Sequence, residues 1–190
     1  MPLTQVSGPA TLPVTLAEAC AHLRIAVGED DAFITDLISA ATSHLDGEEG
    51  VLQRCLVQQS WTYTRDDLPS QGFQVPLVPA SITSVSYVDS GGVTTVLAAD
   101  QYTLSGDWIY PAHSGITWPV PRSQADAVSV TFQAGFGAVE DVPQALKQAI
   151  LLLIGLWYDQ RAAVTTGEIG TVLPLGVDAL ITPFKRSYGA

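Results

Sequence analysis

The most distinctive hydrophobic pattern in the chain is a long helical segment that is apolar on nearly every side. Apolar residues recur there at helical spacing in three stripes, and polar residues occupy only the first turns. Asp141 is a good N-cap residue, Pro143 suits a first turn, and Arg161 suits a helix end. We therefore predict one long helix within residues 138–166. Its core-forming or subunit-facing positions are Leu146, Ile150, Leu153, Trp157 and Arg161.

Two shorter amphipathic helices are expected nearer the N-terminus. In VTLAEACAHLRI, Thr15 and Glu18 have the spacing of a capping box, and apolar residues share one face. The segment DDAFITDLISAATSHLDG follows, capped by Asp30 or Asp31, with apolar residues repeating every four positions until Gly47. Both segments predict short helices that can pack on the longer one.

The period changes to two in the middle of the chain. Segments such as LVQQSWTYTRD and AVSVTFQAGFG alternate between apolar and other residues, as half-buried strands do. The turn sequence DSGG, from Asp89 to Gly92, favours a hairpin. This region therefore predicts five to seven short antiparallel strands.

These elements predict an α+β fold. It combines a small helical bundle, made of two N-terminal helices and one long C-terminal helix, with an inserted antiparallel β module and an extended C-terminal tail. The predicted parts are an extended N-terminal arm with helices at 1–56, the β module at 57–137, the long helix at 138–166, packed on the N-terminal helices, and the tail at 167–190.

The long helix is too short in its apolar part to predict a membrane span. The run from Ala149 to Tyr158 has ten residues, whereas a span needs roughly 20. The N-terminal stretch has neither a basic region nor an apolar signal segment. We therefore expect a soluble protein that is made in the cytoplasm, with no membrane partner.

Composition points to surfaces that are hidden in an assembly. Hydrophobic residues make up 47% of the chain and charged residues only 14%, against about 25% charged in an average protein. Eight basic and nineteen acidic residues give a net charge of −11. This charge argues against stable nucleic-acid binding, and an acidic wall would instead let DNA slide past.

The sequence offers no catalytic constellation. Cys20 and Cys55 lie far apart and are expected to be buried thiols, and the three histidines match no metal-binding motif. Gly135 and Gly137 follow a strand, but the residues around them lack the phosphate-loop signatures. We assign no catalytic, cofactor-binding or metal-binding residue and do not expect an enzyme.

Aromatic residues in the β module leave a second function open. Trp108 and Trp118 could form a platform for a glycan or a protein partner. They could equally fill the core of a small sheet or an interface. The alternative function is therefore a β module that binds such a partner.

The order of the segments carries a resemblance. VTLAEACAHLRI is followed by DDAFITDLISAATSHLDG and the alternating strands, then by AGFG, by VPQALKQAILLLIGLWYDQRAAV and by LPLGVDALITPFKR. From about residue 13 to 186, this order resembles the head–tail connector (adaptor) proteins of long-tailed phages. It is also similar to the adaptors of phage-derived gene transfer agents, and the motifs do not separate the two.

The resemblance implies a structural role at the head–tail junction of a virion or phage-like particle, assembled in the bacterial cytoplasm. Such proteins form a homo-oligomeric ring of about twelve subunits, whose side contacts are heterologous. The ring lies beneath the portal protein, extends the channel through which DNA passes, and docks the next tail or stopper protein. In that family the C-terminal segment contacts the portal, which implies contact candidates at Pro183, Phe184, Lys185, Arg186 and Tyr188.

Overall fold

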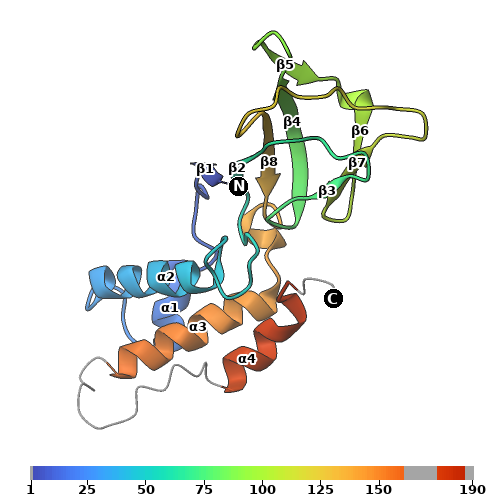
Figure 1. Ribbon diagram of the computed structural model, residues 1–190. Helices are drawn as coiled ribbons and strands as arrows, with labels where there is room; N and C mark the ends of the chain where they lie inside the picture. Colours follow the sequence, from blue (N-terminus) through green and yellow to red (C-terminus); the bar gives the residue numbers. More distant parts are fainter. Residues whose placement is uncertain (1, 161–174, 187–190) are drawn as a thin grey trace, which may run out of the picture. The chain divides into compact units, whose positions relative to one another are not determined.

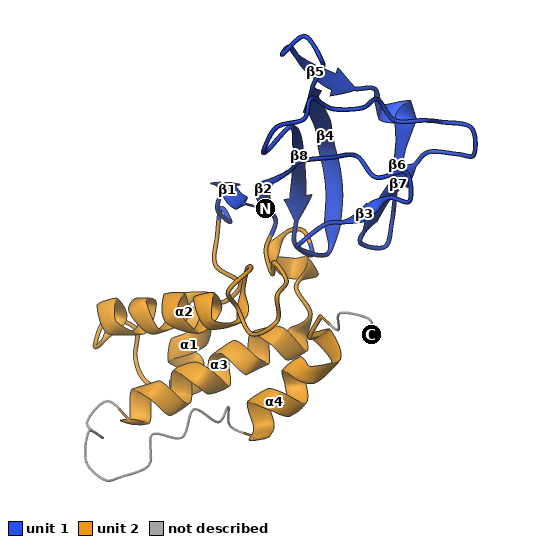
Figure 2. Cartoon of the chain, viewed as in Figure 1, with its two compact units in different colours: residues 1–10, 58–136 blue, residues 11–57, 137–190 orange. Residues whose placement is uncertain are grey.

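The computed structural model describes residues 2–160 and 175–186, and the chain forms two compact units (Figures 1 and 2). Unit 1 contains residues 1–10 and 58–136, and unit 2 contains residues 11–57 and 137–190. Antiparallel sheets lie in the first unit and four α-helices in the second, so the predicted α+β fold class is confirmed.

A five-stranded antiparallel sheet forms the larger part of unit 1. Its strand order is β1-β2-β8-β4-β5. The strands are β1 (Leu3–Ser7), β2 (Gln59–Arg65), β8 (Val128–Ala134), β4 (Ala80–Val88) and β5 (Thr94–Leu97). Every second residue of β2 and β8 is buried, with Trp61 paired to Phe132 and Tyr63 to Val130. This period-2 burial is what the alternating sequence of the central strands predicts.

The hairpin predicted at DSGG joins β4 to β5. Asp89 holds it: its Oδ1 accepts bonds from the backbone N–H of Gly91 at 2.8 Å and of Val93 at 3.0 Å. Gly92 has a φ of 84°, a left-handed conformation that glycine adopts without strain. The turn chemistry alone therefore fixes this hairpin.

A smaller three-stranded antiparallel sheet completes unit 1. Its order is β3 (Phe73–Gln74), β7 (Trp108–Pro111) and β6 (Tyr102–Ser105), and a short 3-10 turn, η1 (Ala99–Gln101), precedes β6. The buried side chains of this sheet include Phe73 and Ile109, which pair across β3 and β7.

The first strand was not predicted from the sequence. The sequence pattern predicted an extended arm at the N-terminus but grouped it with the helices, whereas β1 pairs with β2, with Leu3 opposite Tyr63 and Gln5 opposite Trp61. Four of the five residues of β1 are exposed, so the strand has no alternation that could reveal it. Backbone pairing, rather than burial of side chains, places it in the sheet.

Unit 2 is a helical unit built from both ends of the chain. Its helices are α1 (Leu16–Leu23), α2 (Asp31–Leu45), α3 (Gln144–Asp159) and α4 (Leu175–Ile181), with 3-10 turns η2 (Val139–Asp141) and η4 (Thr182–Phe184). Helix α3 packs against α1, α2 and α4. Its fully buried residues are Leu146, Ala149, Ile150, Leu153 and Ile154. The predicted helical positions 146, 150 and 153 therefore face the core of their own unit.

The start of the long helix differs from the prediction. Asp141 does not cap α3 but closes the turn before it, where its Oδ2 accepts a bond from the backbone N–H of Ala138 at 3.0 Å. Val142 and Pro143 have extended ψ angles of 125° and 131°. Since a proline disfavours the helical conformation of the residue before it, the α-helix begins only after Pro143.

The tail also differs from the extended segment that the sequence predicted. Residues 175–181 form α4, whose Val177 and Ile181 are fully buried. These residues lie four positions apart, so a helix places both on the face that packs against α3. Among the helices that the structure describes, none is both long and apolar enough to cross a membrane.

Burial in α3 predicts a contrast between two leucines of the same helix. Leu153→Ala removes a side chain that is 1% exposed and should lower the free energy of unfolding by about 2–5 kcal/mol. Leu151→Ala, at a half-buried position, is the matched control and should cost clearly less. Chemical denaturation of the two variants checks this, and equal losses would contradict the burial.

The capping box of α1 predicts a pH dependence of stability. Glu18 Oε2 accepts bonds from the backbone N–H and the hydroxyl of Thr15, both at 2.7 Å, and these lower the pKa of the Glu18 carboxyl. A lowered folded-state pKa stabilises the fold above the unfolded pKa, and this contribution is lost as the pH falls through the folded one. The stability difference between the wild type and Glu18→Gln should therefore be largest near pH 7 and shrink below about pH 4. Denaturant titrations from pH 3 to 7 measure it, with Glu29→Gln as control.

Candidate functional site

Three of the helix residues that the sequence singled out are core residues rather than surface residues. Leu146, Ile150 and Leu153 are at most 1% exposed within unit 2. Trp157 is half-buried and its ring contacts His44 of α2 edge-on, with ring centroids 6.1 Å apart. Arg161 lies outside the described residues. Leu146, Ile150 and Leu153 therefore belong to the hydrophobic core of unit 2.

Other elements of unit 2 cover most of α3, which explains its apolar character. Near its C-terminal end, the Tyr158 hydroxyl donates to Asp30 Oδ2 at 2.7 Å, and the Tyr158 ring packs on Phe33. On the side of α1, His22 faces Gly155, and a Cβ atom at this glycine would lie 3.5 Å from His22 Nε2, an ordinary van der Waals distance. A half-buried apolar stripe remains at Leu151, Leu152 and Leu156.

The C-terminal contact candidates are folded onto unit 2 as far as the structure describes them. Pro183 is exposed, whereas Phe184, Lys185 and Arg186 are half-buried, and Tyr188 lies outside the described residues. Lys185 Nζ forms an ion pair with Asp178 Oδ1 of α4 at 2.7 Å. The backbone N–H of Arg186 donates to the carbonyl of Leu52 at 3.2 Å. Leu175, at the start of α4, is 87% exposed and adds an apolar side chain to this segment.

One half of the aromatic platform is absent, because Trp118 is a core residue. Its side chain is 6% exposed, its Nε1 donates to the carbonyl of Gln101 at 2.9 Å, and its ring contacts Phe73 edge-on. Trp108 is 37% exposed, but its ring stacks on that of Tyr110 with centroids 5.8 Å apart. Tyr110 is also 37% exposed, so the two rings form an exposed aromatic surface, but without Trp118 this is not the pair that the sequence predicted.

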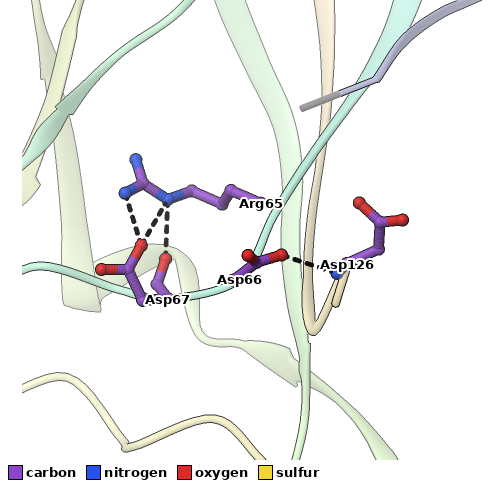
Figure 3. A network of polar contacts seen from close by, with 4 residues as sticks. All are labelled: Arg65, Asp66, Asp67 and Asp126. Atoms are coloured by element: carbon purple, nitrogen blue, oxygen red, sulfur yellow. Dashed lines mark hydrogen bonds and ion pairs between the residues drawn. The ribbon is translucent and has the colours of Figure 1, made fainter. Parts of the chain in front are cut away.

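A polar network organises one end of β2 (Figure 3). Arg65 Nη2 and Nε contact Asp67 Oδ1 at 2.6 and 3.2 Å, and Nε also donates to the Asp67 carbonyl. The guanidinium carbon lies 4.2 Å from the centroid of the Phe73 ring. Next to it, Asp66 Oδ1 accepts the backbone N–H of Asp126 at 2.9 Å. Arg65 thus connects the two sheets of unit 1 by packing, which is a structural role.

Candidate metal-ligand groups and reactive thiols are not found within the described residues. Residues 2–160 and 175–186 contain no group of three His, Cys, Asp or Glu side chains that could hold a metal ion. Cys20 and Cys55 are buried. In the β unit, burial raises the pKa values of the Tyr63 and Tyr102 hydroxyl groups.

The surface feature that sequence reasoning missed is at the edges of the five-stranded sheet. Val6 in β1 is exposed, and so are Val93 and Val96 at β5. Residues 1–17 and 90–99 contain no charged side chain, but neither does the longer stretch 68–88, so composition gives no specific signal for these edges.

Solved structures provide whole-length relatives of this fold. The chain is similar to one in the virion of a native gene transfer agent (GTA) particle, with 26% identity and a TM-score of 0.77 over 100% of this chain and 99% of that one. The same values apply to a chain in the neck of an empty GTA particle computed with C6 symmetry. A chain in the neck of a native GTA particle computed with C12 symmetry has 24% identity and a TM-score of 0.70, which shows the shared fold alone. No protein-family model and no curated protein matches the sequence.

The packing of Arg65 on Phe73 predicts that mutation of Arg65 lowers the free energy of unfolding more than mutation of its ion-pair partner Asp67. Asp67→Asn should lower the free energy of unfolding by less than about 1 kcal/mol, because the Asp67 side chain is 64% exposed and solvent screens the pair. Arg65→Ala should cost about 2–3 kcal/mol, since it also removes the packing on Phe73. Denaturant unfolding in low and high salt separates the two, and similar costs would show that the ion pair dominates.

Proposed function

We propose that this chain is a structural subunit of the neck of a phage-like particle of the gene transfer agent type. The observation that carries the proposal is the whole-length similarity, at 26% identity, to a chain in the virion of a GTA particle. Because both chains are covered almost completely, the similarity includes the helical unit, the inserted sheets and the C-terminal helix. A shared local motif would not carry the same weight.

Within the neck, the proposed role is that of the adaptor ring beneath the portal. The segment order from residue 13 to 186 supports this role, since it resembles that of head–tail adaptors. A similar chain occurs in a neck computed with C6 symmetry, and the ring of about twelve subunits that the resemblance implies is a multiple of six. The ring would extend the DNA channel and dock the next tail or stopper protein.

The charge of the chain supports passage of DNA rather than binding. The net charge is −11, and two of the eight basic residues, Arg65 and Lys185, are paired with carboxylates of the same unit. Without a basic patch, counterion release cannot provide stable affinity for DNA. A channel wall of this chain would let the duplex move without holding it.

The C-terminal segment is the proposed portal contact, and its described residues are arranged as follows. Pro183 and Leu175 are exposed. The Lys185–Asp178 ion pair connects the residues that follow α4 to the helix itself. Phe184, Lys185 and Arg186 flank this surface, and Tyr188 follows in the chain. Protein interfaces usually have an apolar centre with polar residues around it, and this segment has the same combination.

The assembly state tests the proposed function. Light scattering on the purified chain, alone and with the portal protein of the same particle, should give a mass of roughly twelve times the 20.1 kDa monomer in at least one sample. Electrophoresis with linear DNA should show no retention at physiological salt. A chain that stays monomeric and never binds the portal protein would overturn the proposal.

A matched pair of variants tests the portal contact. Leu175→Asp should weaken binding to the portal protein at least tenfold, because it puts a charge into the exposed apolar contact. The fold should be unaffected, since an acid at the first residue of a helix favours it. Val27→Asp is the control, at an exposed valine between α1 and α2. Equal affinity of the two variants would exclude this segment as the contact.

A further inference from the structure

The five-stranded sheet of unit 1 ends in two open edges. In the strand order β1-β2-β8-β4-β5, β1 and β5 each have one hydrogen-bonded neighbour among the described residues. An edge strand presents a row of backbone donors and acceptors on its outer side, which another strand can satisfy. What fits such an edge is therefore an extended segment of backbone.

The two edges lack some of the features with which proteins usually prevent edge-to-edge pairing, although both strands are short and β1 contains a register shift. Charged side chains, lysines above all, and internal prolines are the common protection, and neither β1 (LTQVS) nor β5 (TTVL) has any. The register of β1 shifts between Gln5 and Ser7, so Leu3 to Gln5 remains a regular stretch. Val6 and Val96 are 62% and 67% exposed and offer apolar contacts beside the backbone.

We propose that β1 of one copy of this chain adds to β5 of the next copy, so that the sheet continues from subunit to subunit. This inference rests on the proposed ring and names its side contact. A closed ring needs two different surfaces on each subunit that fit one another. The two edges of one sheet meet this requirement, since each exposes unpaired backbone and the two strands differ.

Electrostatics favours a second copy of the chain at these edges. Copies with a net charge of −11 repel one another, so a stable self-contact must form where acids are few. The segments 1–17 and 90–99, which contain the two edge strands, have no charged side chain. A contact between these two strands therefore brings together no charged side chain of the strands themselves.

Strand directions agree with a cyclic arrangement. Each of the four ladders between β1 and β5 is antiparallel, so the two edge strands run in the same direction. Neighbours in a ring of about twelve are rotated by only about 30°, which keeps these directions nearly aligned. The new pair is therefore parallel, whereas a twofold contact between identical edges would be antiparallel.

The pairing is short, and the ring compensates for this. The regular part of β1, from Leu3 to Gln5, and the four residues of β5 give few hydrogen bonds, and parallel ladders are slightly weaker than antiparallel ones. Both strands are already ordered within a folded sheet, so pairing costs little conformational entropy. In a closed ring each contact is also reinforced by all the others.

Lysines placed on the edges test the proposal. Val6→Lys and Val96→Lys should each raise the protein concentration needed for ring formation at least tenfold, because a charge on the edge opposes pairing. Val120→Lys is the matched control, at an 87% exposed valine of the same unit outside the strands, and should assemble like the wild type. Thermal unfolding of the three variants verifies that they fold.

Mixing the two edge variants gives the decisive measurement. The Val6→Lys protein keeps an intact β5 edge and the Val96→Lys protein keeps an intact β1 edge, so together they can make one good contact. Mass photometry of the mixture should show dimers that do not grow longer, while each variant alone stays monomeric. Dimers of either variant alone would indicate a twofold contact and overturn the parallel pairing.

Failure of this inference can be told apart from failure of the proposed function. Ring-sized particles formed equally well by the wild type and by both edge variants would overturn the strand pairing and leave the ring intact. A wild-type chain that does not assemble, either alone or with the portal protein, would overturn both.

Discussion

The burial of α3 by helices from both ends of the chain is the interaction on which the rest of the molecule depends. α1 and α2 precede the inserted strands, and α4 follows the long helix, yet all three pack on α3. Its core residues, including Leu146 and Ile150, are buried only when residues 11–57 meet residues 137–186. The chain passes between the two units three times, at residues 10–11, 57–58 and 136–137, so the helical unit is assembled from separated segments.

Periodicity predicted the elements whose side chains are sorted by burial. The long helix, the alternating central strands and the DSGG hairpin fall in this class, because each has a local signal. β1 was missed because its side chains are mostly exposed, and α4 because two buried residues in seven make a weak pattern. The start of α3 was predicted too early, since the turn at Asp141 resembles a cap until the geometry of Pro143 is considered.

The candidate surfaces could be predicted only in part, for a related reason. Sequence patterns identify residues that avoid water, and these include both core and interface residues. Leu153 and Trp118 are large apolar residues of the kind that interfaces contain, but each is buried within its own unit. The sheet edges have the opposite character: their binding groups belong to the backbone, which no side-chain pattern reports. Charge is missing over residues 1–17 and 90–99, but it is also missing over 68–88, so the composition does not single out the edges.

A single charge distribution meets two demands of the proposed ring. The acids that keep DNA from sticking to a channel also repel neighbouring copies, so the same property that allows passage opposes assembly. The conflict is resolved if copies touch only where charge is absent, and backbone pairing is an interaction that needs no charge. On this view the neutral edges of β1 and β5 are a consequence of the acidic surface. A chain with a balanced surface charge would have been free to use ion pairs at the same contact.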